Sequence, residues 1–131
     1  LSQGMNAAGV LTTAKHFPGH GDTEVDSHKA LPVLPFSRAR LNEVELYPYK
    51  TPLLQGVQGV MVAHLDVPIL TEDPGLPVSL SKKVVTDVLQ TELGFEGLIF
   101  TDALNMKGAS DFSPDGDVAL KAFLIFEVRE N

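Results

Sequence analysis

The order of short apolar segments and longer helical stretches is the feature that most limits the fold of this chain. Val10–Ala14 is short and rich in β-branched residues, and Val57–Ala63 and Leu98–Thr101 are further apolar runs, as is typical of strands. The continuous run Leu98–Thr101 predicts a strand that is buried on both faces. With helical stretches between the strands, this βαβαβ order predicts an α/β fold with a parallel sheet.

The first helical stretch is marked by a capping residue and two prolines. Ser37 can cap a helix that starts near Arg38, because its side-chain oxygen can accept a bond from the first turn. Pro48 is acceptable as the first residue of a second helical piece, which Gly56 could end. Pro52 lies inside that second piece, where proline is unfavourable.

The second helical stretch has clearer boundaries. Ser81 can cap it and Gly94 can end it, which are the residue types expected at the two ends of a helix. The apolar residues between them recur at helical spacing and predict one buried face. They are Val84, Val85, Val88, Leu89 and Leu93.

Composition excludes several classes of protein. The chain has 131 residues and 44% hydrophobic residues, which suffices for a single globular domain with a core. The net charge of −7 makes a nucleic-acid partner unexpected, because there is no basic stripe for phosphates. No apolar run approaches the roughly 20 residues of a membrane span. The absence of cysteine excludes disulfides and thiolate zinc sites and is compatible with either redox compartment.

Polar residues follow all three predicted strands. Lys15 and His16 come after the first strand, His64 after the second, and Asp102 after the third. Ligands and catalytic groups of parallel α/β folds sit at the carboxyl ends of the strands. We therefore expect these four side chains to share one edge of the sheet and to form an active site.

The loop from Lys15 to Pro35 carries three of the four histidines within thirteen residues. Such a loop is too long for a simple connection, and loops of this kind concentrate function. One interpretation is a polar loop that satisfies its own backbone. A second is a metal site, for which five side chains are suitable ligands, although no helical His-Glu-x-x-His pair is present. The five are His16, His20, Asp22, Asp26 and His28.

A third interpretation of the same loop is acid/base chemistry. Asp26 and His28 are two residues apart, so in an extended segment their side chains point the same way. A carboxylate beside an imidazole fixes its tautomer and favours the protonated form. Such a histidine can donate and then accept a proton near neutral pH. Asp102 would be the partner carboxylate at the strand end.

The sequence resembles a known family at this point. Lys15-His16-Phe17-Pro18-Gly19-His20-Gly21-Asp22 followed by Asp26-Ser27-His28 is similar to the signature of bacterial β-N-acetylhexosaminidases of glycoside hydrolase family 3. Later segments are similar in the same order, and the resemblance runs from about Leu11 to Leu124. They are Val60-Met61-Val62-Ala63-His64, Pro77-Val78-Ser79-Leu80-Ser81, and Gly94-Phe95-Glu96-Gly97-Leu98-Ile99-Phe100-Thr101-Asp102-Ala103-Leu104-Asn105-Met106.

The resemblance implies roles for the site residues. Asp102 matches the nucleophile, His28 the general acid/base, and Asp26 its dyad partner. His20 and Asp22 are then residues that shape the loop. Lys15 and His16 match residues that bind the sugar. His64 is also expected at the substrate site, as a residue of the pocket wall or as one that supports the site from behind.

The implied activity is retaining hydrolysis of terminal β-linked N-acetylglucosamine, with peptidoglycan fragments as the expected source. The family uses no metal or other cofactor, so the resemblance speaks against the metal interpretation. Because a neutral imidazole repels an incoming anion less than a carboxylate does, a β-glycoside phosphorylase of the same family is an alternative.

The resemblance also implies a partial (β/α)₈ barrel. A full barrel needs roughly 200 residues or more, so we expect residues 1–131 to be a fragment of one catalytic domain. The chain begins at Leu1 and not at Met, so we expect its natural N-terminus, with any signal peptide, to be missing. Ile125–Asn131 departs from the family pattern. A further alternative is therefore a catalytically incomplete fragment that binds sugar or depends on a partner. Open strand edges predict that the fragment by itself is inactive, poorly stable and prone to self-association.

Overall fold

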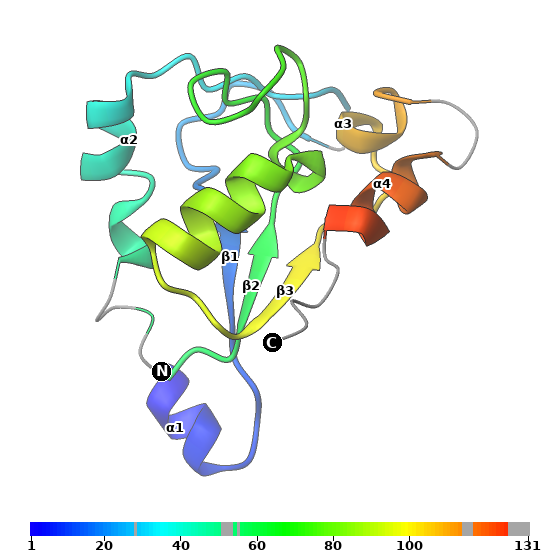
Figure 1. The fold of residues 1–131 in the computed structure, drawn as a ribbon. Helices are drawn as coiled ribbons and strands as arrows, with labels where there is room; N and C mark the ends of the chain where they lie inside the picture. The colour runs from blue at the N-terminus through cyan, green and yellow to red at the C-terminus, as the bar shows by residue number, and fades with distance from the viewer. Residues whose placement is uncertain (28, 51–53, 55, 114–116, 126–131) are drawn as a thin grey trace.

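The computed structural model contains one parallel sheet of three strands, in the order β1-β2-β3. The strands are β1 (Thr13–Phe17), β2 (Gly59–Val62) and β3 (Leu98–Thr101). Their carboxyl ends point to the same side, where the long loops gather (Figure 1). The structure describes residues 1–27, 29–50, 54, 56–113 and 117–125. The predicted α/β class and the parallel order are confirmed.

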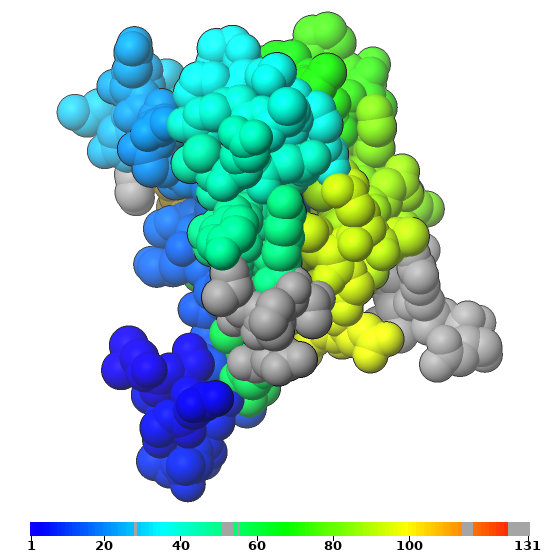
Figure 2. Space-filling view, turned by 90° about the vertical axis from the view of Figure 1, so that its left-hand side faces the viewer, coloured from blue at the N-terminus to red at the C-terminus, as the bar shows by residue number. Residues whose placement is uncertain are grey.

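Helices lie on one side of the sheet and at its two ends. The ten-residue helix η3 crosses the sheet, and α1 extends below the amino ends of the strands (Figure 1). In the space-filling view α1 projects from the rest of the molecule (Figure 2). The helices are α1 (Ser2–Ala7), α2 (Arg38–Glu43), η1 (Tyr47–Tyr49), η2 (Val78–Leu80), η3 (Lys83–Glu92), α3 (Lys107–Ser110) and α4 (Asp117–Ile125).

Both capping predictions are confirmed. The Ser37 hydroxyl accepts a hydrogen bond from the Arg40 amide at the start of α2. The Ser81 hydroxyl accepts one from the Val84 amide at the start of η3, at 3.2 Å. Gly94 follows η3 with a φ of +68°, a conformation that residues with a Cβ disfavour.

Two details of the helices differ from the prediction. The second helical piece of the first stretch is only the single 3₁₀ turn η1, with Pro48 near its start; Pro52 lies outside the described residues. Helix η3 is a π-helix, and the Leu93 amide after it bonds to the Val88 carbonyl five residues back. The predicted apolar face is nevertheless buried, because residues four and five positions apart share a face of a π-helix.

The core lies between the sheet and η3. It contains Val60 and Val62 of β2, Val84 and Leu89 of η3, and Phe17 at the end of β1. All five of these side chains are completely buried. A smaller second cluster packs α4 and the α3 segment against η2, around Leu76, Leu80, Ala109, Val118 and Ala122. Burial of these apolar faces is what holds the helices on the sheet.

The first strand begins three residues later than predicted. Pairing starts at Thr13↔Gly59, and the Thr12 carbonyl already accepts bonds from the Gln58 and Gly59 amides. Val10 and Leu11, which were expected in the strand, are exposed. The start of β2 at Gly59 therefore fixes where β1 can begin, and apolar content alone misplaced the boundary.

The prediction that β3 is buried on both faces is wrong for this chain. Leu98 is 55% exposed and Phe100 is 43% exposed, and both point away from the face that carries Val60 and Ile99. None of the helices in the described part of the chain lies over that opposite face of the sheet (Figure 1). Gly59 leaves room there, because a Cβ at this position would lie 2.8 Å from the Phe100 ring.

Candidate active site

The carboxyl end of the sheet brings together side chains from all three strands. His16 belongs to β1, His64 follows β2, and Asp102 follows β3. The His16 Nε2 atom lies 3.7 Å from the Asp102 Oδ2 atom. The predicted shared edge is thus confirmed, since two residues 86 positions apart meet there.

A bulge in β1 sets the direction of His16. Lys15 pairs with Met61 and Phe17 pairs with Val62, so the ladder passes over His16. Bulges next to active sites commonly re-aim a side chain in this way. Lys15 and His16 therefore lie inside the strand, whereas the sequence placed them after it. The bulge explains why residues within the strand can still face the site.

The backbone fixes Asp102 at the end of β3. Its amide donates to the Val62 carbonyl of β2 at 3.0 Å, which extends the ladder by one residue. Its Oδ1 atom accepts a hydrogen bond from the Ala103 amide at 2.8 Å. The Oδ2 atom is the one that faces His16, and the side chain is 24% exposed. One oxygen of the carboxylate is thus held while the other faces the shared edge.

His64 lies behind Asp102, completely buried. Its Nε2–H donates to the Ala103 carbonyl at 3.0 Å, because a carbonyl can only accept. Nδ1 then accepts from the Ser79 hydroxyl at 2.7 Å. Burial lowers the pKa of His64, and the bond to the Ala103 carbonyl offsets part of this effect. A neutral, fully buried His64 supports the Asp102 segment from behind and does not face the pocket.

The loop after β1 is organised around His20. The Thr23 hydroxyl lies 2.7 Å from His20 Nδ1 and 3.0 Å from the His20 carbonyl. His20 Nε2 lies 3.2 Å from the Ser27 hydroxyl. All three contacts are satisfied when Thr23 donates to the carbonyl, Nδ1–H donates to Thr23, and Ser27 donates to Nε2. The His20 ring also packs edge-on against His16, with centroids 5.9 Å apart. These contacts support the loop-shaping role expected for His20.

Arg40 of α2 holds the same loop from its other side. Its guanidinium donates to both oxygens of Glu45, at 2.7 and 2.6 Å, and it also bonds to Asp22. The hydrogen bonds that Arg40 donates to Glu45 and the charge of Asp22 raise the pKa of Arg40. The Glu45 side chain is only 4% exposed, which is unusual for a carboxylate unless it is paired. Sequence reasoning had given Asp22 a loop-shaping role but had not found its partner.

A hollow lies between this loop and α2. It measures about 260 Å³ and is lined by Lys15, His16 and His20 on one side and Glu45 and Tyr49 on the other. Burial raises the pKa of Tyr49 to about 12, so this phenol stays neutral. The hollow opens next to the edge shared by His16 and Asp102.

The predicted Asp26/His28 pair is only partly described. The Asp26 carbonyl accepts hydrogen bonds from the Lys29 and Ala30 amides, which makes a turn. His28 lies outside the described residues, so its proximity to Asp26 and Asp102 stays a prediction. Among the described residues, no three His, Asp or Glu side chains are arranged to hold a metal ion. The same part of the chain has no helix that is long and apolar enough to cross a membrane.

Three further residues of the site region were missed by sequence reasoning. Ser79 is completely buried and binds His64. Ser27 is 5% exposed although it stands in a polar loop. A Cβ at Gly108 would lie 3.0 Å from the His64 Cβ. Their partners come from distant parts of the chain, so no local pattern marks them.

Comparison with known proteins gives matches over most of this chain. Residues 1–124 match the family described as the glycosyl hydrolase family 3 N terminal domain. A protein named beta-hexosaminidase from Shewanella frigidimarina is 44% identical over 108 residues. The match covers 82% of this chain but 31% of that protein. The chain therefore spans less than a third of this curated relative.

Solved structures share the fold. A glycoside hydrolase family 3 beta-N-acetylglucosaminidase from Paenibacillus sp. str. FPU-7 superposes with a TM-score of 0.88 at 42% identity, over 95% of this chain and 24% of that one. A beta-glucoside phosphorylase named BglX superposes with a TM-score of 0.86 at 30% identity, over 94% of this chain and 24% of that one. Both matches cover nearly the whole of this chain and about a quarter of the larger protein.

Proposed function

This chain belongs to glycosyl hydrolase family 3, and on that premise we propose that it is part of a retaining exo-glycosidase. The substrate that we propose is a glycan with a terminal β-linked N-acetylglucosamine. Support comes from the relatives named beta-hexosaminidase and beta-N-acetylglucosaminidase. The observation that carries the proposal is the meeting of Asp102 and His16 at the carboxyl end of the sheet, which is where barrel enzymes place their chemistry.

In the proposed first step, the Asp102 carboxylate attacks the anomeric carbon. The bond between that carbon and the leaving oxygen breaks, and His28 donates a proton to the oxygen, with Asp26 beside it. In the second step, water gives a proton to His28 and attacks the anomeric carbon, so that the bond to Asp102 breaks. The Oδ1 atom of Asp102 is held by the Ala103 amide and the Oδ2 atom faces the shared edge beside His16, which fits the role of an oriented nucleophile.

Lys15 and His16 are the proposed sugar-binding residues. Both line the hollow beside β1, and an ammonium and an imidazole can both donate hydrogen bonds to sugar hydroxyls. His64 is proposed to act indirectly, through the Ala103 carbonyl next to Asp102. Metal and other cofactors have no role in this mechanism.

The test is an assay of the full-length protein with an aryl β-N-acetylglucosaminide. We expect release of the aryl alcohol by the wild type and a large loss in the His28→Ala variant. Release by the wild type that does not exceed this control contradicts the proposal. Peptidoglycan fragments with a terminal N-acetylglucosamine are the natural substrate that we propose, and release of the free sugar from such fragments tests this point separately.

A phosphorylase is the second candidate, because the BglX structure superposes on this chain. A neutral imidazole in the acid/base position repels an incoming phosphate less than a carboxylate in that position would. In that reaction phosphate replaces water and attacks the anomeric carbon of the glycosyl–enzyme, which yields a sugar 1-phosphate. Product analysis with and without inorganic phosphate distinguishes the two reactions. A sugar 1-phosphate as the main product would favour the phosphorylase.

We also propose that residues 1–131 are part of a single catalytic barrel and depend on the rest of it. The edge strands β1 and β3 each have one unpaired side in the described sheet, and Leu98 and Phe100 are exposed on its open face. Apolar surface of this kind favours association. We expect the 131-residue chain alone to self-associate and to lack turnover. A monodisperse, active monomer in light scattering and the aryl assay would contradict this.

A further inference from the structure

The buried Ser27 joins the loop after β1 to the segment that follows Asp102. Its carbonyl accepts a hydrogen bond from the Gly108 amide of α3 at 3.2 Å, and its hydroxyl lies 3.2 Å from His20 Nε2. Only 5% of Ser27 is exposed, although its neighbours in the loop are largely exposed. A serine that is buried within a polar loop, with both its side chain and its backbone bonded, marks a fixed point of that loop.

The other side of this contact is closely packed. Gly108 packs on His64, which is completely buried and bonded at both ring nitrogens. A Cβ at Gly108 would lie 3.0 Å from the His64 Cβ and 3.1 Å from the Ser27 carbonyl oxygen. The missing side chain at position 108 thus allows the loop backbone to approach. The φ of Gly108 is not in the left-handed region, so close packing, and not backbone conformation, is the reason for glycine here.

The same contact links the two halves of the proposed site. Ser27 stands between Asp26 and His28 in the sequence, and Gly108 belongs to the segment that leaves Asp102. His64 holds the Ala103 carbonyl at the start of that segment and touches Gly108 further along it. A shift of Ser27 relative to Gly108 would therefore move the loop relative to Asp102.

We propose that Ser27 and Gly108 are positioning residues: their contact fixes the loop segment with Asp26 at a set distance from Asp102. The catalytic part of this proposal rests on the proposed function, in which the residue after Ser27 is the acid/base. The structural part depends only on the described contacts. His20 contributes a second point of attachment through the Ser27 hydroxyl.

The first experiment compares amide hydrogen exchange in the full-length wild type and in the Gly108→Ala variant. The added methyl group has to displace either the fixed His64 or the loop, and the loop is the softer partner. The Lys29 and Ala30 amides, which bond to the Asp26 carbonyl, should lose protection by about tenfold or more. The amides of β2 should keep theirs. Gly4→Ala is the matched control, because a Cβ at Gly4 meets nothing within 4 Å.

The second experiment measures kcat/KM for aryl β-N-acetylglucosaminides with increasingly poor leaving groups. Poor leaving groups need protonation more than good ones. If the substitution misplaces the acid/base, the loss in kcat/KM should grow with leaving-group pKa, to about a hundredfold for the poorest. A merely structural defect would lower kcat/KM by the same factor for every leaving group.

Unchanged protection of Lys29 and Ala30 in Gly108→Ala, or an equal loss for all leaving groups, would overturn the proposal. If Gly108→Ala does not fold, Ser27→Ala takes its place, since it removes only the hydroxyl contact with His20. A smaller loss of protection in the same amides is then expected, and unchanged protection would overturn the proposal. If the wild type has no glycosidase activity, the proposed function fails, while the exchange result still decides whether Ser27 anchors the loop.

Discussion

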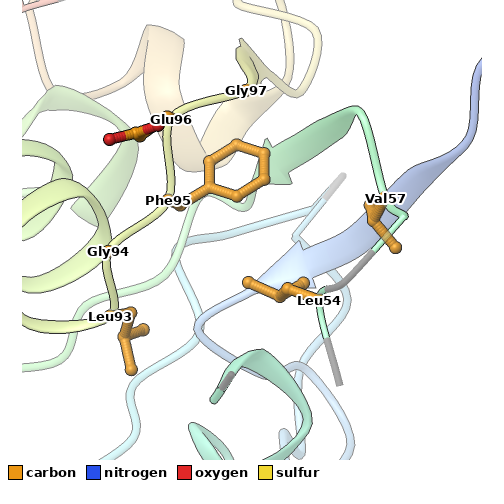
Figure 3. A pocket seen from close by; sticks show the side chains of 7 residues that line it. All are labelled: Leu54, Val57, Leu93, Gly94, Phe95, Glu96 and Gly97. Carbon is orange, nitrogen blue, oxygen red and sulfur yellow. The ribbon is translucent and has the colours of Figure 1, made fainter. Parts of the chain in front are cut away.

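The two ends of the sheet are built from different kinds of residues. The carboxyl end gathers His16, His64 and Asp102 with hydrogen-bonded serines behind them. The amino end has a hollow of about 210 Å³ lined mainly by apolar side chains, including Leu54, Leu93 and Phe95 (Figure 3). The difference fits a sheet with one end arranged for the proposed chemistry and the other for packing, as in barrel enzymes generally. Substitutions at the two ends should therefore separate activity from stability.

The largest expected effect is on activity, at the carboxyl end. Asp102→Asn in the full-length protein should lower kcat/KM for an aryl β-N-acetylglucosaminide at least about a thousandfold, because the amide is a poor nucleophile. Its free energy of unfolding should change by less than about 0.5 kcal/mol, since Asn keeps the oxygen that accepts from the Ala103 amide. A variant that retains a tenth of the activity would remove Asp102 from the nucleophile role.

The next effect is on stability, at the amino end. Phe95 is 6% exposed and belongs to the main core. Phe95→Ala should lower the free energy of unfolding of the same protein by about 3 kcal/mol or more, through lost burial and an added cavity. Below the unfolding temperature kcat/KM should stay within about twofold of the wild type. The neighbouring exposed Glu96, changed to Gln, is the control, and an equal loss in Glu96→Gln would contradict the packing explanation.

Gly97 provides a test of the same end by overpacking. A Cβ at Gly97 would lie 2.5 Å from the Gln58 carbonyl oxygen and 2.6 Å from the Phe95 ring. That carbonyl accepts the Leu98 amide at 2.8 Å, so Gly97→Ala should weaken the start of the β2–β3 ladder. We expect a loss of about 1–3 kcal/mol in urea unfolding. Gly4→Ala, where there is open space, should show no loss; if both variants lose stability equally, close approach is not the cause.

The smallest effect concerns the pH dependence of stability at the carboxyl end. The pKa of His64 is lowered by burial from an ordinary value of 6.5. As the pH falls below 6.5, the unfolded chain binds a proton that the folded protein still rejects, so stability decreases down to the folded pKa. This contribution is at most about 1.4 kcal/mol per pH unit. In the His64→Gln variant, the free energy of unfolding measured in urea should decrease less steeply below pH 6.5 than in the wild type. Parallel wild-type and variant curves would show that His64 does not contribute.

Some parts of this protein follow from the sequence by itself. The parallel order, the limits of β3, the Ser37 and Ser81 caps and the end of η3 at Gly94 were all predicted correctly. The caps and the helix end depend on residue types within a few positions, namely a side-chain oxygen near a free amide and a glycine that allows positive φ. The parallel order follows from the alternation of apolar runs and helical stretches along the chain. The common edge for His16 and Asp102 also followed, because parallel strands place their carboxyl ends together.

Tertiary structure decided the rest. The ladder with β2 shifted β1 and produced the bulge that turns His16 toward Asp102. Burial by distant segments removed His64 from the pocket, and the uncovered face of the sheet left Phe100 exposed. The Ser27–Gly108 contact joins residues 81 positions apart. Pairing partners, covering helices and close backbone approach are properties of distant chain segments, so neither residue type nor spacing could specify them.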